Sequence, residues 1–87
     1  MNPMAEQINE VDGVIKSLFE IQEDNTVPRN VRSKIEAINN TLKEEDGLSI
    51  KINKALNELG ELASDVNLQA YTRTQIWNIM SVLEKLY

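Results

Sequence analysis

Cysteine and histidine are both absent from this chain of 87 residues. Without cysteine, the chain forms no disulfide, zinc–thiolate site, thiol nucleophile or iron–sulfur cluster. Without histidine, it lacks the commonest general base and the commonest protein ligand of metals. The two absences weigh against an enzyme and against a metalloprotein.

Glycine and proline are scarce, with three and two residues, which favours helices joined by few turns. No apolar run approaches the roughly 20 residues that a membrane-spanning helix needs. Residues 1–6 also lack the basic-then-apolar plan of a secretory signal. The sequence therefore predicts a cytoplasmic protein with no membrane segment.

Acidic residues outnumber basic ones by 14 to 9, so the net charge is -5. Such a surface repels phosphate backbones, which disfavours nucleic acid as a partner. The length suits a single core. We expect one helical domain over residues 1–87, with a loose N-terminus at residues 1–3.

Apolar residues recur every three or four positions in four segments, which is the spacing of amphipathic helices. We expect a first helix over about residues 4–23. A second helix should begin near Pro28, with Thr26 or Val27 at its N-cap, and stop at Gly47. The predicted core stripes of these two helices are Met4, Ile8, Val11, Ile15 and Leu18, then Val31, Ile35, Ile38 and Leu42.

A third helix is expected from Ser49, a good N-cap residue, to about residue 65. A fourth should begin near Thr72, because Thr72 and Gln75 fit a capping box. The predicted core stripes of these helices are Ile52, Leu56, Leu59 and Ala63, then Ile76, Ile79, Leu83 and Leu86.

The two halves of the chain align when the sequence is shifted against itself by 41 residues without a gap. Short connections favour antiparallel neighbours. We therefore predict an all-α fold, a four-helix up-and-down bundle made of two similar helical hairpins. The alternative is a pair of stacked solenoid hairpins, because residues 24–42 are similar to the second half of a HEAT repeat. Two repeats are too few for a typical solenoid.

Arg29, Arg32 and Arg73 are expected at one end of the bundle, near the N-termini of the second and fourth helices. Guanidinium groups beside two helix N-termini could hold an anion, such as a phosphate or a partner's carboxylate. The structural interpretation, which we favour, is that Arg32 pairs with Asp24 across its own loop. The repeat then predicts the same pair for Arg73 and Asp65.

The predicted fourth helix is more apolar than one buried stripe requires. Trp77 and Met80 fall beside its core face, with Tyr71 near them, and Trp and Tyr often anchor protein interfaces. These residues could form an interface with a protein partner, in the simplest case a homodimer. Equally, the helix could be more deeply buried than the others, with Trp77 closing the core.

No catalytic or metal-binding constellation is found in the sequence. The serines have no histidine to activate them, and the three glycines are isolated rather than grouped in a phosphate loop. A di-iron bundle needs Glu-x-x-His motifs, which this chain cannot form. A filled bundle of this size also offers little room for a pocket. We expect no cofactor, no metal and no enzymatic activity.

Two segments, TVPRNVR over residues 26–32 and YTRTQIWNI over residues 71–79, resemble a family of short archaeal proteins catalogued as uncharacterised protein family 0147. The likeness extends over nearly the whole chain, and the string YTRTQIW is its most specific part. The resemblance implies an archaeal, cytoplasmic helical bundle. It brings no activity, cofactor or site residue.

No motif in the sequence says what the protein does. The interpretation that we favour is a non-catalytic protein-interaction or structural module, with self-association through the fourth helix as one form of it. The alternative is an anion- or nucleic-acid-binding accessory protein that uses the arginine cluster.

Overall fold

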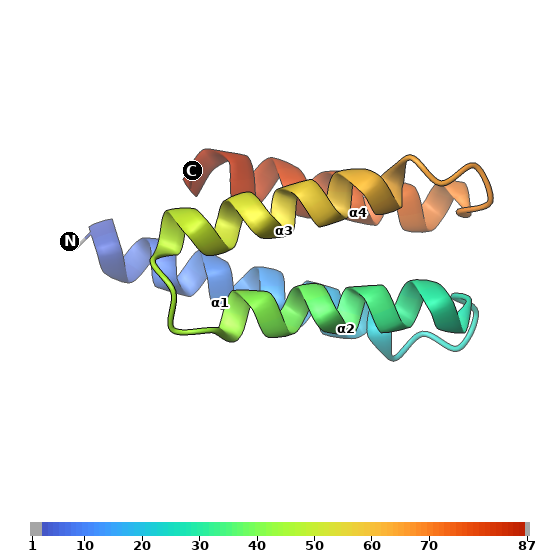
Figure 1. Cartoon of the computed structure of the whole chain (residues 1–87), viewed down its shortest axis with the longest axis horizontal. Helices are drawn as coiled ribbons and strands as arrows, with labels where there is room; N and C mark the ends of the chain where they lie inside the picture. Colours follow the sequence, from blue (N-terminus) through green and yellow to red (C-terminus); the bar gives the residue numbers. More distant parts are fainter. Residues whose placement is uncertain (1–2, 87) are drawn as a thin grey trace.

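Four α-helices follow one another in the computed structural model, which describes residues 3–86 and the side chains from residue 9 onward. The helices are α1 (Pro3–Gln22), α2 (Arg29–Lys43), α3 (Leu48–Ala63) and α4 (Ala70–Leu86), and this part of the chain contains no strand. Successive helices run in opposite directions along a body of 40 × 20 × 20 Å (Figure 1). The predicted four-helix bundle is confirmed.

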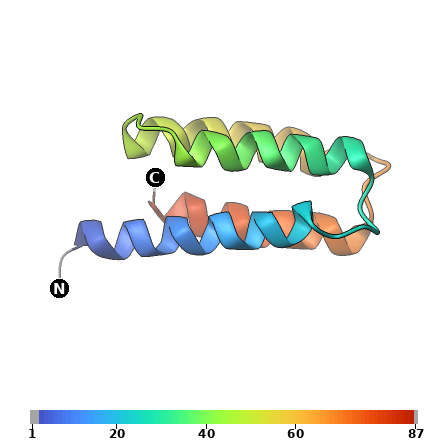
Figure 2. The ribbon, with the colours of Figure 1, turned by 90° about the horizontal axis from the view of Figure 1, so that it is seen from below.

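The helices form a closed ring in which each packs against two others. α1 contacts α2 and α4, and α3 contacts α2 and α4. Figure 2 shows the resulting two layers, with α2 and α3 above α1 and α4. The α1–α4 contact closes the bundle, so the alternative of an open solenoid is wrong.

The loops 23–28 and 64–69 lie together at what we call the loop end, opposite the 44–47 turn (Figure 1).

The core follows the 41-residue repeat almost position by position. Buried residues separated by 41 positions form nine pairs, and only Asn39 and Ala63 stand outside this pairing. Burial of apolar surface is the main stabilising term of such a bundle. The pairs are Val11/Ile52, Val14/Ala55, Leu18/Leu59, Ile21/Leu62, Val27/Leu68, Val31/Thr72, Ile35/Ile76, Ile38/Ile79 and Leu42/Leu83.

The two loops at the loop end share the same hydrogen bonds. The Val27 N–H donates to the carbonyl of Asp24 at 3.1 Å, and the Leu68 N–H donates to that of Asp65 at 3.1 Å. In each loop the aspartate Oδ1 accepts a bond from the backbone N–H two residues later, at 2.9 Å in both. This is the local bond that makes Asp a frequent turn residue. The paired aspartates of the sequence therefore build two equivalent turns.

The fourth helix begins earlier than predicted. α4 starts at Ala70, so Thr72 is a buried residue inside the first turn and not an N-cap. The predicted capping box of Thr72 and Gln75 is wrong because Thr72 takes the core position that Val31 holds in α2. Core packing has overridden a local capping signal.

The starts of α2 and α3 also lie one or two residues from the predicted positions. Pro28 is the N-cap of α2, with φ -56° and ψ 146°, in place of Thr26 or Val27. Gly47 is the N-cap of α3, which begins one residue before Ser49, while α2 ends at Lys43.

The buried faces of α1 and α3 are rotated slightly from the predicted stripes. Val14 and Ala55 are buried, whereas Ile15 and Leu56 are only partly buried. Both changes occur at equivalent positions, because α1 and α3 present the same face to the bundle axis. The predicted core residues Met4 and Ile8 lie outside the described side chains. Of the N-terminus predicted to be loose, residues 1–2 lie outside the described residues, and Pro3 is the first residue of α1.

Candidate functional site

The Arg73 side chain connects the end of α3 to the start of α4. Its Nε donates to the carbonyl of Ala63 at 2.9 Å, and its Nη2 donates to those of Asp65 at 2.7 Å and Leu68 at 3.1 Å. The last carbonyls of a helix have no helical partner, and a basic side chain can satisfy them. Arg73 therefore braces the α3–α4 loop through backbone oxygens.

Arg32 makes the equivalent contact in the first hairpin with a single bond. Its Nε donates to the carbonyl of Val27 at 3.0 Å. The expected ion pairs of Arg32 with Asp24 and of Arg73 with Asp65 do not form. The one ion pair within residues 9–86 joins the exposed side chains of Lys54 and Asp46 at 3.6 Å. Both arginines donate to carbonyl oxygens, while each aspartate accepts bonds inside its own turn through Oδ1.

The carboxylate of Asp24 is held in its charged form by Thr26. The Thr26 hydroxyl donates to Oδ1 at 2.6 Å and the Thr26 N–H donates to the same oxygen at 2.9 Å. These two bonds, with a smaller contribution from the charge of Arg32, lower the pKa of Asp24 below its usual value. The group is a stable anion and not a proton donor at neutral pH.

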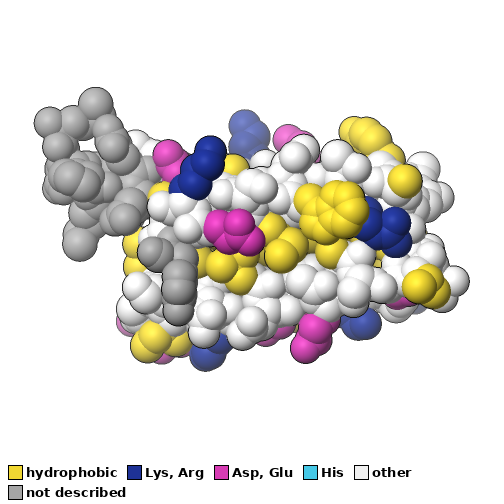
Figure 3. Space-filling view, turned by 90° about the horizontal axis from the view of Figure 1, so that it is seen from above, with side chains coloured by type: hydrophobic (Ala, Val, Ile, Leu, Met, Phe, Trp, Pro, Cys, Tyr) yellow, Lys and Arg dark blue, Asp and Glu magenta, His cyan; other side chains and the backbone are white. Residues whose placement is uncertain are grey.

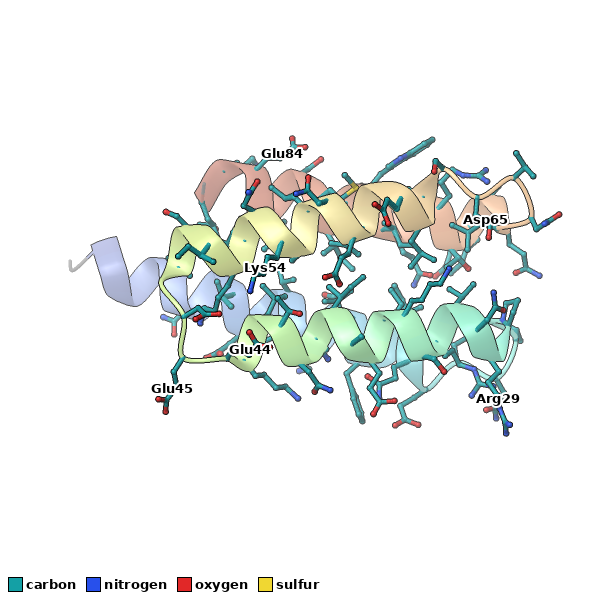
Figure 4. The ribbon with its side chains drawn as sticks, in the orientation of Figure 1. Arg29, Glu44, Glu45, Lys54, Asp65 and Glu84 are labelled. Carbon is teal, nitrogen blue, oxygen red and sulfur yellow. The ribbon has the colours of Figure 1, made fainter. Side chains whose placement is uncertain are left out.

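The third arginine of the predicted cluster stands apart from the other two. Arg29 is exposed at the start of α2, and Figure 4 shows its side chain pointing away from the bundle at the loop end. The donors of Arg32 and Arg73 are directed to carbonyls of two different loops. The structure therefore does not gather the three guanidinium groups around one point.

Trp77 and Met80 are three residues apart on α4, a spacing that makes their side chains neighbours on the helix surface. Trp77 is 54% exposed, although the core beneath it is fully buried. The Met80 Cε lies 3.7 Å from the point that a Cβ on Gly60 would occupy, so Met80 packs against α3 at Gly60, which is itself partly buried. Figure 3 shows hydrophobic side chains gathered along this seam between α3 and α4. We call Trp77, Met80 and Gly60 the Trp77 patch.

Tyr71 belongs to a different face of α4. It is 72% exposed, but it precedes Trp77 by six residues. At about 100° per residue the two side chains point about 120° apart around the helix axis. Of the three predicted interface residues, the structure brings together Trp77 and Met80 and leaves Tyr71 aside.

The Trp77 patch exists in the second hairpin only. The positions of the first hairpin that correspond to Trp77 and Met80 are Glu36 and Asn39, and Gly60 corresponds to Phe19. The core pairs match between the halves, whereas these positions differ in chemistry, and Asn39 is buried where Met80 is only partly buried. The patch is therefore not a by-product of the repeated core.

A groove that the sequence did not predict runs between α1 and α4. Its volume is about 560 Å³, and Val14, Ile79 and Val82 supply its apolar part. A hollow of about 250 Å³ lies at the equivalent seam between α2 and α3. The larger groove could have been predicted from Gly13 and Ser17. These two small residues are four positions apart on the side of α1 that faces α4. The remaining lining residues are Glu10, Gly13, Ser17, Glu20, Gln75, Asn78 and Lys85.

The described residues contain neither a membrane-spanning helix nor a cluster of metal ligands. No helix in this part of the chain has the length and apolar character needed to cross a membrane. No three acidic side chains within residues 9–86 come together as metal ligands would.

Sequence comparison relates the chain to archaeal proteins over nearly its whole length. The model of the uncharacterised protein family UPF0147 matches residues 1–86. A UPF0147 protein of Methanocaldococcus jannaschii is 43% identical over 75 residues, 85% of this chain and 81% of the relative. One from Archaeoglobus fulgidus is 37% identical over 76 residues, 87% of each chain. One from Pyrococcus abyssi is 31% identical over 87 residues, 99% of each chain.

Two solved structures share the fold. The crystal structure described as "unknown function protein MMP1188" has a TM-score of 0.85 and 35% identity, with 97% of this chain and 92% of that one covered. A UPF0147 protein from Thermoplasma acidophilum has a TM-score of 0.88 and 33% identity, with 93% and 96% covered. Neither description names an activity or a ligand.

Proposed function

The chain belongs to the uncharacterised protein family UPF0147, as the two sequence segments predicted, and we propose that it is a non-catalytic protein-interaction module that works through the Trp77 patch. The family has no named enzymatic function, so membership leaves the activity to be argued from the site.

The observation that carries the proposal is the half-exposed indole of Trp77 beside Met80. Burying a large apolar side chain contributes about 1.5–3 kcal/mol. The core of this bundle is complete without Trp77, so the indole does not close it. Trp is among the residues that most often dominate binding energy at interfaces, and Met adapts its shape to a partner. The patch is therefore suited to be covered by another protein surface.

The anion- or nucleic-acid-binding alternative has less support. Arg73 already donates three hydrogen bonds to loop carbonyls, and Arg32 donates one. These bonds direct the two guanidinium groups to two different loops, so the two groups do not converge on one anion. The net charge of -5 would also oppose its approach.

Two further parts of the proposal concern chemistry and place. The proposed absence of enzymatic activity rests on the lack of histidine and cysteine. For the same reason we propose that the α1–α4 groove is not an active site. We further propose that the module works in the cytoplasm, which agrees with the lack of a membrane-spanning helix among the described residues.

Site-specific photocrosslinking in the native cells tests whether another protein surface covers the Trp77 patch. A photoreactive phenylalanine analogue replaces Trp77 in one variant and Phe19 in the matched control, since Phe19 is 49% exposed on a different helix. We expect discrete crosslinked species from position 77 and not from position 19. No crosslink at 77, or the same species from both positions, would refute the proposed function.

A further inference from the structure

We propose that the Trp77 patch binds a second copy of this chain, with the two α4 helices packed antiparallel about a twofold axis. This inference rests on the proposed function and names its partner. It depends on the order of four residues along α4, Arg73, Trp77, Met80 and Glu84, and on the chemistry of each.

These four residues form one stripe on the surface of α4. Their spacing of four, three and four residues is the spacing at which side chains share one face of a helix. Glu84 is exposed, and Figure 4 shows it pointing away from the bundle. On the face drawn in Figure 3, acidic and basic side chains lie beside the hydrophobic side chains of the α3–α4 seam. The stripe therefore reads basic, apolar, apolar, acidic.

A stripe with this order is complementary to itself when it is reversed. In an antiparallel pair whose twofold axis passes between residues 78 and 79, Trp77 faces Met80 of the second copy. Arg73 then faces Glu84, because both pairs of residue numbers add to the same total. Twofold symmetry repeats each contact, which gives two indole–thioether contacts flanked by two ion pairs.

The opposite orientation lacks this complementarity. A parallel pair would place Arg73 against Arg73 and Glu84 against Glu84. Like charges held at an interface cost free energy and select against the wrong arrangement. The order of charges along α4 therefore favours the antiparallel pair. The two charged residues, Arg73 and Glu84, stand on either side of Trp77 and Met80.

Arg73 has donors left for such an ion pair. A guanidinium carries five N–H groups. The loop carbonyls bind Nε and Nη2 of Arg73, and Nη1 makes no hydrogen bond within the described part of the chain. The bonds to the loop hold the guanidinium in place, so little side-chain entropy is lost when Nη1 meets a carboxylate. One arginine can brace its own loop and contact the second copy.

The first test is the oligomeric state of the whole chain. Sedimentation equilibrium is expected to show a monomer–dimer equilibrium, with Trp77→Gln shifted to monomer and Phe19→Gln unchanged. A monomer at roughly millimolar concentration would overturn the twofold pair. The proposed function would survive that result if position 77 still crosslinks to a different protein, and it would fall as well if no crosslink forms.

A charge exchange tests the orientation. Glu84→Lys and Arg73→Glu should each weaken the dimer about tenfold or more, because each places like charges face to face. An equimolar mixture of the two variants should form a heterodimer with the affinity restored. Lys85→Glu changes a charge one position off the stripe and should leave the equilibrium unchanged. Failure of the mixture to associate would overturn the antiparallel model.

Nitroxide distances provide a test that leaves Arg73 in place, since Arg73→Glu also removes the brace of the α3–α4 loop. The chain has no cysteine, so Lys85→Cys gives a single labelling site. The antiparallel pair separates the two labels by about 20 Å along the helix axes, because position 85 faces position 72. A parallel pair would bring them to about the interaxial distance of 10 Å. The shorter distance would contradict the proposal.

Discussion

The Nε of Arg73 donates a hydrogen bond of 2.9 Å to the carbonyl of Ala63, the last residue of α3. A side chain of one helix thus satisfies the open end of the helix before it. The same guanidinium holds two carbonyls of the intervening loop. Arg32 holds only one, so the second hairpin is the more firmly closed of the two.

Replacing Arg73 should cost more stability than replacing its repeat equivalent. Arg73→Gln is expected to lower the free energy of unfolding by about 2–3 kcal/mol, because three bonds from a charged donor are lost. Arg32→Gln removes one such bond and should cost about 1 kcal/mol. Urea unfolding at one fixed protein concentration measures both. An equal loss at the two positions would mean that the extra bonds of Arg73 contribute nothing.

Asn39 is the polar residue of the core that the repeat does not explain. Its Nδ2 donates to the carbonyl of Ile15 at 3.2 Å, while its buried Oδ1 has no partner. An unpaired buried acceptor costs about 1–3 kcal/mol, which exceeds the worth of one hydrogen bond. Asn39→Leu should therefore raise the free energy of unfolding by about 1 kcal/mol.

Thermal unfolding of the Asn39 variants checks this expectation. Asn39→Asp is the contrasting change, since it places a carboxylate in the core and should lower the melting temperature. A loss of stability in Asn39→Leu would contradict the expected gain.

Asp24 should make stability depend on pH in the acid range. Its pKa is lowered in the folded chain by the Thr26 hydroxyl and N–H. A lowered folded pKa gives a stabilising contribution that is present above the unfolded pKa of about 3.9 and is lost as pH falls through the folded pKa. Carboxyl ¹³C shifts should place the Asp24 titration below that unfolded value.

The Thr26→Val variant is the control for this titration. It removes the hydroxyl donor and keeps the backbone donor, so the pKa of Asp24 should rise part of the way back. An unchanged titration in Thr26→Val would assign the shift to another cause.

Gly13 lies inside α1 on the wall of the α1–α4 groove. A Cβ added there meets nothing within 4 Å. Gly13→Ala should raise the free energy of unfolding by about 0.5–1 kcal/mol, because alanine loses less backbone entropy in a helix. Gly60→Ala is the comparison, where the added Cβ makes an ordinary contact of 3.7 Å with Met80. If Gly60→Ala raised the free energy of unfolding and Gly13→Ala lowered it, the prediction for Gly13 would be wrong.

The sequence predicted the elements and the repeat because these depend on apolar spacing. All four stripes lie on true helices, and the loop aspartates build equivalent turns. The sequence could not decide between Val14 and Ile15 for the core, since both are apolar and adjacent. Their burial depends on a small rotation of α1 that only its neighbouring helices determine.

The errors at the site have a related origin. Charge alone suggested that the arginines pair with aspartates. Carbonyl oxygens at a helix end also accept hydrogen bonds, but residue types in the sequence do not show which carbonyls are available. Thr72 carried a capping signal, yet its position in the repeat required it to be buried. The groove went unpredicted because it depends on the spacing between α1 and α4, which are far apart in sequence.

The matched hairpins have a consequence for how the chain assembles. Because their buried residues correspond position by position, the first hairpin of one molecule offers nearly the same docking face as the second. Two chains folding close together could exchange hairpins and build mixed bundles with well-filled interiors. The differences that discourage such exchange are few, with Asn39 opposed to Met80 and Phe19 to Gly60. Asn39 is the one of these positions that is buried, so it is the difference that an exchanged hairpin would bring into the core.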